Sequence, residues 1–441
     1  MAKLRSVGLD IGTTTTQMIL SELTVENRAS SFAVPDMDIS GRKILYQSPI
    51  HFTPLLSSSR MDGEGIRKIV EAEYRSAGIT RQEVDTGAVI ITGESSRKEN
   101  ARAVLEALSE LAGDFVVATA GPDLESALAA RGAGAVAYSA ESGKSVLHMD
   151  IGGGTSNLAL IEDGHITATG CLNVGGRLLK LDETGKITYI SPVLEGLTDF
   201  SPGQTVNESQ VFELAQLLAQ ALEMAAGLRP RSELFEKLYT KECVIASQCA
   251  HWRSDLPDDL ILSFSGGVAD CIETSHPWLA FGDMGPTLGR AIRESRLCKG
   301  EYRLGEQTVR ATVIGAGCHS AQLSGSTVFA RNVKLPLKNL PVVPWGRQTD
   351  TPGVLALEGG GGYAQVKRIA EEVAQGWSQK ELYLAVEQDM AKALGQMLAL
   401  KFPDRPILCL DRLRLSEGSY LDVGTPVGPA FPVVIKTLIM R

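Results

Sequence analysis

One pattern of apolar and polar residues occurs twice along the chain, at an offset of 140 residues. In each copy an apolar run ends in Asp-Ile-Gly, a few small polar residues follow, and a second apolar run begins. The copies are Leu9–Leu20 and Met149–Leu160, and they align without a gap. Strand-like runs joined by a Gly- and Thr-rich turn predict β-hairpins. We therefore expect two hairpins, with Asp10 and Asp150 at the ends of their first strands.

Elsewhere, strand patterns alternate with helix patterns, which predicts α/β lobes with largely parallel sheets. Apolar residues at helical spacing predict helices over residues 62–77 and 208–226. The Ala- and Gly-rich stretch 123–140 predicts a helix that another backbone can approach closely. The other expected elements are a third strand ending near Val34, strands over 87–92, 115–118, 406–410 and 432–438, a strand within 261–270, and helices over 98–111 and 381–400.

The two turns have a composition that suits phosphate binding. Glycine allows close backbone approach, and successive N–H groups with Thr or Ser hydroxyls form an anion nest. A carboxylate beside the nest would repel phosphate unless Mg²⁺, which is held by few carboxylates and several waters, lay between them. One Gly-rich turn indicates little, but the duplication indicates a clamp for nucleotide phosphates. The candidate residues are Asp10, Gly12, Thr13, Thr14, Thr15, Asp150, Gly152, Gly153, Gly154, Thr155 and Ser156.

Composition and charge narrow the class of protein. The chain has 441 residues, 44% of them hydrophobic and 22% charged, which is ordinary for a globular protein of about three domain-sized units. A net charge of −9 and 5% aromatics disfavour a nucleic-acid or membrane-surface binder. Seven cysteines without a Cys-x-x-Cys pair favour reduced thiols, and no apolar run reaches the ~20 residues of a membrane span. We expect a cytoplasmic protein without a signal peptide.

The two hairpins resemble the phosphate-1 and phosphate-2 motifs of the actin, sugar-kinase and heat-shock-chaperone ATPase superfamily. This resemblance implies an α/β, actin-like ATPase fold, with two duplicated lobes and ATP in the cleft between them. Further segments follow in the superfamily's order. The Ala-rich stretch resembles the connect-1 helix, Gly175-Gly176 the glycines after phosphate-2, Gly266-Gly267 the adenosine motif, and Ala311–Gly317 the connect-2 segment.

These motifs divide the chain into three expected parts. Residues 1–140 form an N-terminal actin-like lobe with phosphate-1 and connect-1. Residues 141–325 form a second lobe with phosphate-2, adenosine and connect-2 motifs, and residues 326–441 form a C-terminal α/β extension. Within the extension, Glu358–Gly362 reads as a flexible turn rather than a second phosphate loop.

Across nearly the whole chain, the sequence resembles the reactivating factors of ethanolamine ammonia-lyase. The more particular matches are C-terminal: Gln322–Thr327, Tyr420–Pro426 and Pro432–Thr437. The resemblance implies a chaperone-like, Mg²⁺-dependent ATPase of ethanolamine utilisation, with ATP/ADP and Mg²⁺ as cofactors. Its partner would be the adenosylcobalamin-dependent lyase, from which it releases damaged cobalamin so that intact cofactor can bind. Association with a bacterial microcompartment and a homo-oligomeric state are also compatible with the family.

The resemblance also implies roles for the candidate residues. Asp10 and Asp150, which we expect at solvent-facing strand ends, would organise Mg²⁺ and its waters. Glu125, at the start of connect-1, matches an acidic residue near the phosphates and would position the attacking water. Gly266 and Gly267 would let the backbone pass under the ribose and base, while the turn residues would hold phosphates.

Two other functions fit the same scaffold. A small-molecule kinase would need an aspartate base at an acceptor hydroxyl, and the sequence shows no signature of an acceptor pocket. An actin-like filament or scaffold protein often carries a terminal amphipathic membrane helix, whereas this chain ends in a strand pattern.

Overall fold

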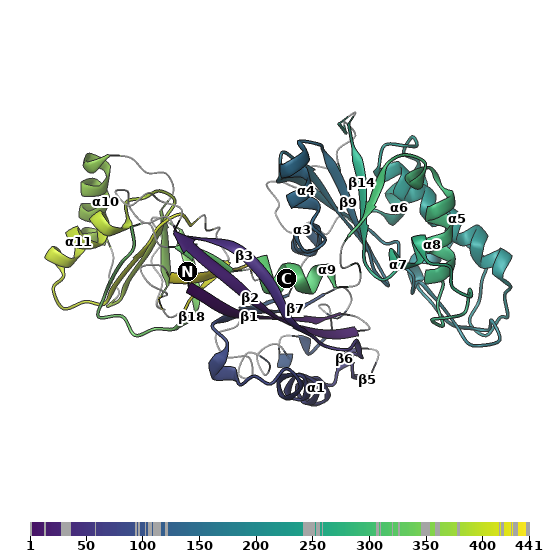
Figure 1. Ribbon diagram of the computed structural model, residues 1–441, viewed down its shortest axis with the longest axis horizontal. Helices are drawn as coiled ribbons and strands as arrows, with labels where there is room; N and C mark the ends of the chain where they lie inside the picture. The colour runs from purple at the N-terminus through teal and green to yellow at the C-terminus, as the bar shows by residue number, and fades with distance from the viewer. Residues whose placement is uncertain are drawn as a thin grey trace.

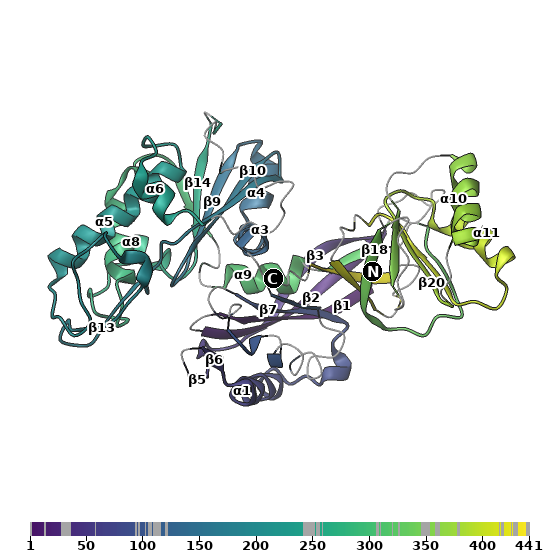
Figure 2. The same cartoon turned by 180° about the vertical axis from the view of Figure 1, so that it is seen from behind.

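The structure of the protein is a computed structural model. Its strands form three large sheets, of six, five and eight strands, and two small two-stranded sheets. We call the first lobe I, the second lobe II and the third the C-terminal sheet; lobe I lies between the other two (Figures 1 and 2). The residues described are 2–12, 15–27, 37–57, 59–92, 95, 98–101, 103–104, 108, 116–119, 122–240, 252, 256–257, 259–305, 308, 310–319, 321–324, 327–344, 353–357, 362–376, 380–413, 415, 419–424, 426 and 431–437.

Lobe I combines three antiparallel strands with two parallel ones. Its order is β3-β2-β1-β7-β8, and β1 is antiparallel to β2 but parallel to β7. The elements are β1 (Ala2–Ile11), β2 (Thr15–Asn27), β3 (Met37–Gln47), β4 (His51–Phe52), which pairs with β2, β5 (Leu55–Ser57), β6 (Arg60–Met61), α1 (Gly63–Ser76), η1 (Arg81–Glu83), β7 (Thr86–Ile91) and β8 (Val116–Thr119).

Lobe II repeats this arrangement strand for strand. Its order is β11-β10-β9-β14-β15, with β9 antiparallel to β10 and parallel to β14. The repeat confirms the predicted actin-like architecture of two duplicated lobes. Its elements are α3 (Pro122–Gly132), α4 (Ala135–Ser142), β9 (Val146–Ile151), β10 (Ser156–Glu162), β11 (His165–Leu172), β12 (Leu179–Leu181), β13 (Ile187–Ile190), η3 (Pro192–Leu194), α5 (Glu208–Ala225), α6 (Glu233–Leu238), β14 (Ile261–Ser265), α7 (Asp270–Glu273), α8 (Gly285–Glu294), η4 (Arg296–Cys298) and β15 (Tyr302–Leu304).

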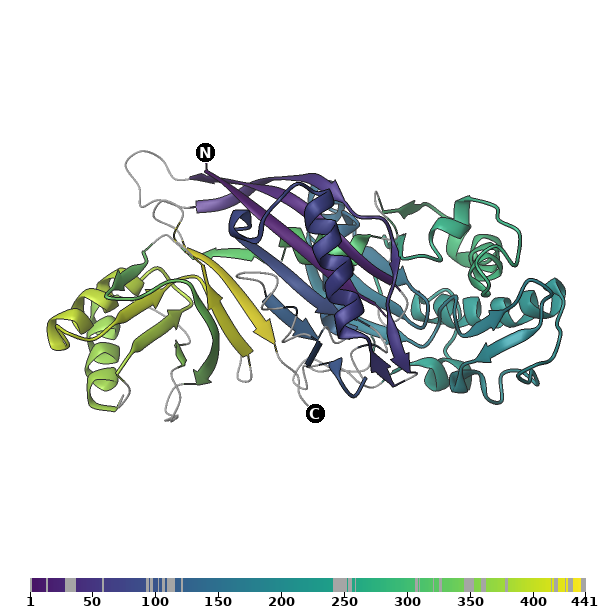
Figure 3. The ribbon, with the colours of Figure 1, turned by 90° about the horizontal axis from the view of Figure 1, so that it is seen from below.

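Strand alternation decides which side chains face the space between the lobes. In β1, Val7, Leu9 and Ile11 pack with α1 on the outer face, so the residues between them point the other way. That inner face is covered by α9 (Ala311–His319), as Figures 1 and 3 show together. In β9, Met149 and Ile151 likewise belong to the outer core of lobe II. The even-numbered neighbours of these residues therefore lie on the faces covered by α9 in lobe I and by α3 in lobe II.

Helices α3 and α9 cross between the two lobes at close range. A Cβ on Gly132 of α3 would come well within 3.0 Å of the Ala311 carbonyl oxygen, and one on Gly315 of α9 would do the same at Leu128. The small residues of the predicted connect-1 and connect-2 segments thus serve backbone-to-backbone packing. The single helix expected over 123–140 is wrong, because Gly134, with φ +80°, separates α3 from α4.

The C-terminal sheet is a separate α/β unit. Its order is β16-β23-β22-β18-β19-β20-β21-β17, and the run from β18 to β21 is parallel. Figure 1 shows both of its helices at the outer end of the molecule. The elements are β16 (Ala321–Ser324), β17 (Phe329–Arg331), β18 (Leu337–Pro344), β19 (Val354–Leu357), α10 (Tyr363–Gly376), β20 (Leu382–Val386), α11 (Ala391–Lys401), β21 (Ile407–Leu410), β22 (Ser419–Val423) and β23 (Phe431–Thr437).

One further sequence prediction is wrong. Residues 381–400 are not one helix, since the buried strand β20 precedes α11. The strand expected to end near Val34 falls on residues 28–36, which lie outside the described residues, and the described third strand of lobe I is Met37–Gln47. The helix expected over 98–111 falls partly outside the described residues, but Ala101, Val104 and Leu108 are helical and buried. Residues 358–361 of the Gly-rich turn also lie outside them.

Candidate nucleotide site between two duplicated turns

The two predicted turns have the same local geometry. The Gly12 amide donates to the Thr15 carbonyl at 2.8 Å, and the Gly152 amide to the Thr155 carbonyl at 2.9 Å. Asp10 and Asp150 occupy matching positions on the strands that enter these turns. Both aspartates lie on the strand faces opposite the outer cores, which are the faces against which α9 and α3 pack.

Asp10 lies in a mostly buried, negatively charged setting. Burial raises the pKa of Asp10 to about 7, a hydrogen bond from Thr92 opposes the rise, and the charge of Asp150 adds to it. Thr92, which follows β7, donates its hydroxyl to Asp10 Oδ1 at 2.9 Å. A cation between the two carboxylates would relieve this repulsion.

Asp150 is held by two hydroxyls from other elements. Ser265, at the end of β14, donates to Oδ1 at 2.5 Å, and Thr312 of α9 donates to Oδ2 at 3.3 Å. Asp150 is only 8% exposed, and burial raises its pKa. The expectation of a solvent-facing strand end is therefore wrong for Asp150, because α9 and β14 cover its carboxylate.

A buried histidine continues this hydrogen-bond chain. His148 lies two residues before Asp150 on the same face of β9, and its ring nitrogens contact Ser265 Oγ at 2.9 Å and Ser263 Oγ at 3.1 Å. Burial lowers the pKa of His148 to about 3, so the ring is neutral. When Asp150 is ionised, Ser265 donates to it and accepts from Nε2–H, which leaves Nδ1 to accept from Ser263. No pattern in the sequence indicates a role for these three residues.

Glu125 lies beside the second turn. It is 7% exposed on α3, and it accepts a 2.8 Å hydrogen bond from the side-chain amide of Asn157. Asn157 is paired directly with Asp150 across the hairpin, so both side chains lie on one face of the sheet. The structure thus brings Glu125 to the same side of the hairpin as Asp150.

Two buried amide oxygens next to the aspartates fit a cation or its waters. Gln17 pairs with Asp10 as Asn157 pairs with Asp150. Among the described residues, Gln17 Oε1 and Asn157 Oδ1 are buried without a hydrogen-bond partner. The same part of the chain shows no cluster of three His, Cys, Asp or Glu side chains around a metal position. A site that offers carboxylate and amide oxygens but no such cluster suits Mg²⁺, because a bound Mg²⁺ ion keeps most of its waters.

The backbone of the second turn is packed from one side and open on the other. The Gly176 and Arg177 amides donate to the Gly152 and Gly153 carbonyls at 3.0 and 2.6 Å, and a Cβ on Gly175 would come within 3.0 Å of Gly153. Gly175 and Gly176 are therefore more than a plain turn, because their lack of side chains permits this contact. By contrast, a Cβ on Gly154 would have no neighbour within 4 Å, which leaves room for a ligand.

Some candidate residues lie differently from expectation. The hydroxyl of Ser156 is fully buried and donates to the Val174 carbonyl at 2.8 Å, so it points away from the turn's open side. Gly266 has φ +89° and packs against the backbone of Ile151, while Gly267 has open space around it. Glycine is thus required at position 266 by the protein's own backbone packing and not by a ligand. Thr13 and Thr14 lie outside the described residues.

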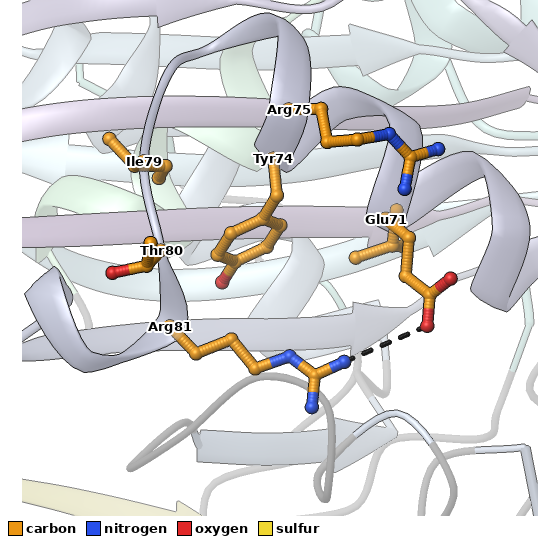
Figure 4. Close-up of a pocket in the computed structure, with 7 residues that line it drawn as sticks. Glu71, Tyr74, Arg75, Ile79, Thr80 and Arg81 are labelled. Carbon is orange, nitrogen blue, oxygen red and sulfur yellow. Dashed lines mark ion pairs between the residues drawn. The ribbon is translucent and has the colours of Figure 1, made fainter.

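A cavity of about 170 Å³ lies elsewhere, on the outer side of lobe I. It is lined by the end of α1 and by the segment that follows, including Tyr74, Thr80 and Arg81 (Figure 4). Glu71 forms an ion pair with Arg81 at 3.7 Å at its edge. The cavity is on the α1 face of the sheet, away from Asp10, and it does not belong to the site between the turns.

Comparison with known proteins identifies the family of this chain. The profile of the family described as ethanolamine utilisation protein EutA matches residues 2–360 and 348–441. The ethanolamine ammonia-lyase reactivases EutA of Salmonella typhimurium (strain LT2) and Escherichia coli (strain K12) are each 38% identical to this chain, over 99% of it and 98% of their own length.

A solved structure of an Aquifex aeolicus PPX-GPPA enzyme is more distant. It is 13% identical, covers 71% of this chain and 99% of its own, and has a TM-score of 0.43. No helix in the described part of the chain is long and apolar enough to cross a membrane. The family profile and the full-length relatives show that this chain belongs to the EutA family of ethanolamine utilisation proteins.

Proposed function

We propose that the protein is an ATP-dependent reactivating factor for ethanolamine ammonia-lyase. The observation that carries this proposal is the 38% identity, over nearly the full length of both chains, to two proteins named reactivases of that enzyme. The site supports the ATP-dependent part, because two equivalent Gly- and Thr-rich turns occur in two lobes joined by crossing helices.

The residues of the two turns divide the work in this proposal. Asp10 and Asp150 hold Mg²⁺ through its waters, and the unpartnered oxygens of Gln17 and Asn157 complete the oxygen-rich surroundings. The bound Mg²⁺ would neutralise phosphate charge. Backbone amides of Gly12 and Gly152–Gly154, with the hydroxyls of the turn threonines, hold phosphates. Glu125 orients the attacking water, and Gly267 leaves room for the nucleoside.

In this proposal, ATP binding is coupled to the relative position of the lobes through the contact between Asp150 and α9. Asp150 belongs to lobe II but accepts a hydrogen bond from Thr312 on α9, which packs against the sheet of lobe I. A ligand held by both turns therefore favours one relative position of the lobes. A reactivating protein that binds the open, cofactor-free lyase more tightly can shift the lyase toward that state only by its differential affinity for the two states. Hydrolysis of ATP then changes the lobe position and releases the lyase from the reactivating protein.

The test is an exchange assay with inactivated lyase. Ethanolamine ammonia-lyase is blocked with cyanocobalamin, a tight analogue without the adenosyl group, and mixed with this protein, ATP, Mg²⁺ and free adenosylcobalamin. We expect deamination of ethanolamine to return and cyanocobalamin to appear in the filtrate. Omitting ATP should prevent repeated rescue.

Two controls make this assay decisive. Asp150→Ala should behave like the omission of ATP, whereas Glu301→Gln, on the surface of lobe II and paired with Lys144, should rescue like the parent. Equal recovery without the protein, or no recovery of a matched lyase with it, would refute the reactivase function. ATP consumption that depends on a small hydroxyl compound instead of the lyase would support the kinase alternative.

A further inference from the structure

Arg177 lies directly over the second turn. Its amide donates to the Gly153 carbonyl at 2.6 Å, and its Cδ is 3.3 Å from the position that a Cβ on Gly153 would take. The close approach depends on Gly175, where a Cβ would come within 3.0 Å of the Gly153 backbone. The side-chain stem of Arg177 is thus fixed against the segment that offers its amides to an anion.

A buried carboxylate fixes the direction of the guanidinium. Arg177 Nε donates to Asp283 Oδ2 at 3.1 Å, and the other oxygen of Asp283 accepts from the Gly285 amide at 2.8 Å, at the start of α8. The Asp283 side chain is 8% exposed, and that of Arg177 is 27% exposed. Among the described residues, the two terminal nitrogens of Arg177 have no hydrogen-bond partner, and the partly exposed side chain leaves them accessible to a ligand.

The negative charges of the site favour a cationic side chain next to the phosphates. Asp10, Asp150 and Glu125 all bring carboxylates toward the space where phosphates would lie, and one Mg²⁺ balances only two of these charges. A guanidinium offers parallel N–H donors that match phosphate oxygens, and it is less strongly hydrated than an ammonium. An arginine held in place within the same chain can also stabilise charge that develops during phosphoryl transfer.

We propose that Arg177 contacts a phosphate of the bound nucleotide and that Asp283 is the positioning residue that aims it. This inference rests on the proposed nucleotide function. A purely structural reading is that the ion pair only ties the loop after β11 to α8. If Arg177 contacts phosphate, its substitution lowers nucleotide affinity more than the substitution of another arginine that costs the same stability. If the ion pair is only structural, the two substitutions have the same effect on affinity.

The chain provides a matched control for this difference. Arg229 also donates from Nε to a buried carboxylate in lobe II, that of Glu223, at 2.8 Å, with exposures of 35% and 4%. It does not contact either turn. Arg229→Gln therefore removes an ion pair of the same kind without touching the nucleotide site, and it should lower the melting temperature while leaving the affinity for ATP unchanged.

The experiment compares the affinity for Mg²⁺·ATP, by calorimetry, with the melting temperature. Arg177→Gln should weaken ATP binding by roughly tenfold or more, the usual loss for a hydrogen bond to a charged group. Arg177→Lys, which keeps the stem and the charge, should fall between this variant and the parent. Asp283→Asn, which still accepts from Gly285, should also lose part of the affinity.

The inference is overturned if Arg177→Gln binds ATP as tightly as the parent. If that variant does not fold, the same result from Arg177→Lys and Asp283→Asn overturns it. Equal losses of ATP affinity in Arg177→Gln and Arg229→Gln would also show a structural role only. A parent protein that binds no ATP would refute the proposed nucleotide function itself, and the inference with it.

Discussion

Asp10 and Asp150 occupy equivalent positions in two equivalent hairpins, yet they accept hydrogen bonds from different elements. Thr92 supplies one hydroxyl to Asp10 from within lobe I. Ser265 and Thr312 supply two to Asp150, from the neighbouring strand and from the crossing helix. The carboxylate of Asp150 is therefore held by more hydrogen bonds than that of Asp10, and one of these bonds connects it to α9.

The duplicated pattern made the aspartates and turn glycines predictable from sequence. Their hydrogen-bond partners were not, because Thr92, Ser265 and Thr312 are separated from the aspartates by 82, 115 and 162 residues. No local pattern encodes such pairings, and single serines and threonines in a sequence carry little information. Burial of Asp150 was missed for the same reason, since the elements that cover it are distant in the chain.

The first prediction concerns the pH dependence of stability at Asp10. Its pKa is raised from an ordinary 3.8 to about 7 in the folded protein, so between these values the folded state binds more protons than the unfolded chain. The free energy of unfolding should therefore fall as the pH rises through this window. Asp10→Asn removes that contribution, and without nucleotide it should exceed the parent in stability above pH 7, by about 1 kcal/mol or more.

The measurement is denaturant unfolding of both proteins between pH 5 and 8. The difference between variant and parent should grow with pH and level off above about pH 7. A difference that stays constant across the range would contradict the buried, charge-coupled setting of Asp10.

The second prediction concerns the support of Asp150. Ser265→Ala removes the 2.5 Å hydrogen bond and isolates His148 from the carboxylate. Groups that orient a metal-binding side chain typically matter by about 10- to 100-fold in metal affinity or activity. We expect ATP hydrolysis to need a correspondingly higher Mg²⁺ concentration.

Ser139→Ala is the matched control for Ser265→Ala. Ser139 is also fully buried in lobe II and donates to the Lys144 carbonyl at 2.9 Å, away from the turns. Both variants should lose about 1 kcal/mol of stability. If their Mg²⁺ dependence is also the same, Ser265 has no role in positioning Asp150.

At the scale of elements, the strands and helices with a clear periodicity were predicted well. Helix α1 begins after the capping residue Asp62, which accepts from the Gly65 amide at 3.0 Å, and it buries Ile66 and Val70 at helical spacing. Strand β3 contains Gly41, a residue type that disfavours strands, but Gly41 pairs with Thr24 of β2, and this pairing overrides its local preference.

The third prediction concerns the crossing of α3 and α9. A methyl group at Gly315 would meet the Leu128 carbonyl, so Gly315→Ala must push the two helices apart. Overpacking of this kind typically costs about 1–3 kcal/mol. We expect a lower urea midpoint and, in the exchange assay, slower rescue of the lyase, because the lobe motion of the proposed function would pass through this crossing.

Gly376→Ala provides the comparison, since a Cβ at the end of α10 would have no neighbour within 4 Å. It should leave both stability and rescue near the parental values. Equal effects of the two substitutions would show that the crossing is not tightly packed.

At the scale of the whole molecule, the strand orders show two equivalent lobes. The same five-strand arrangement occurs in lobe I and lobe II, and α3 and α9 pack against each other between the two sheets. In the proposed function, a phosphate chain held by both turns would link the two lobes. The C-terminal sheet, with its own helices and core, lies outside this pair.

Calorimetric titration of the protein with ATP in the presence of Mg²⁺ tests the central claim, that the two hairpins form one site. The parent should bind one ATP per chain. Asp10→Ala in lobe I and Asp150→Ala in lobe II should each weaken that single binding event, although the substitutions lie in different lobes. Binding of two nucleotides per chain, or parental affinity in either variant, would contradict a shared site between the lobes.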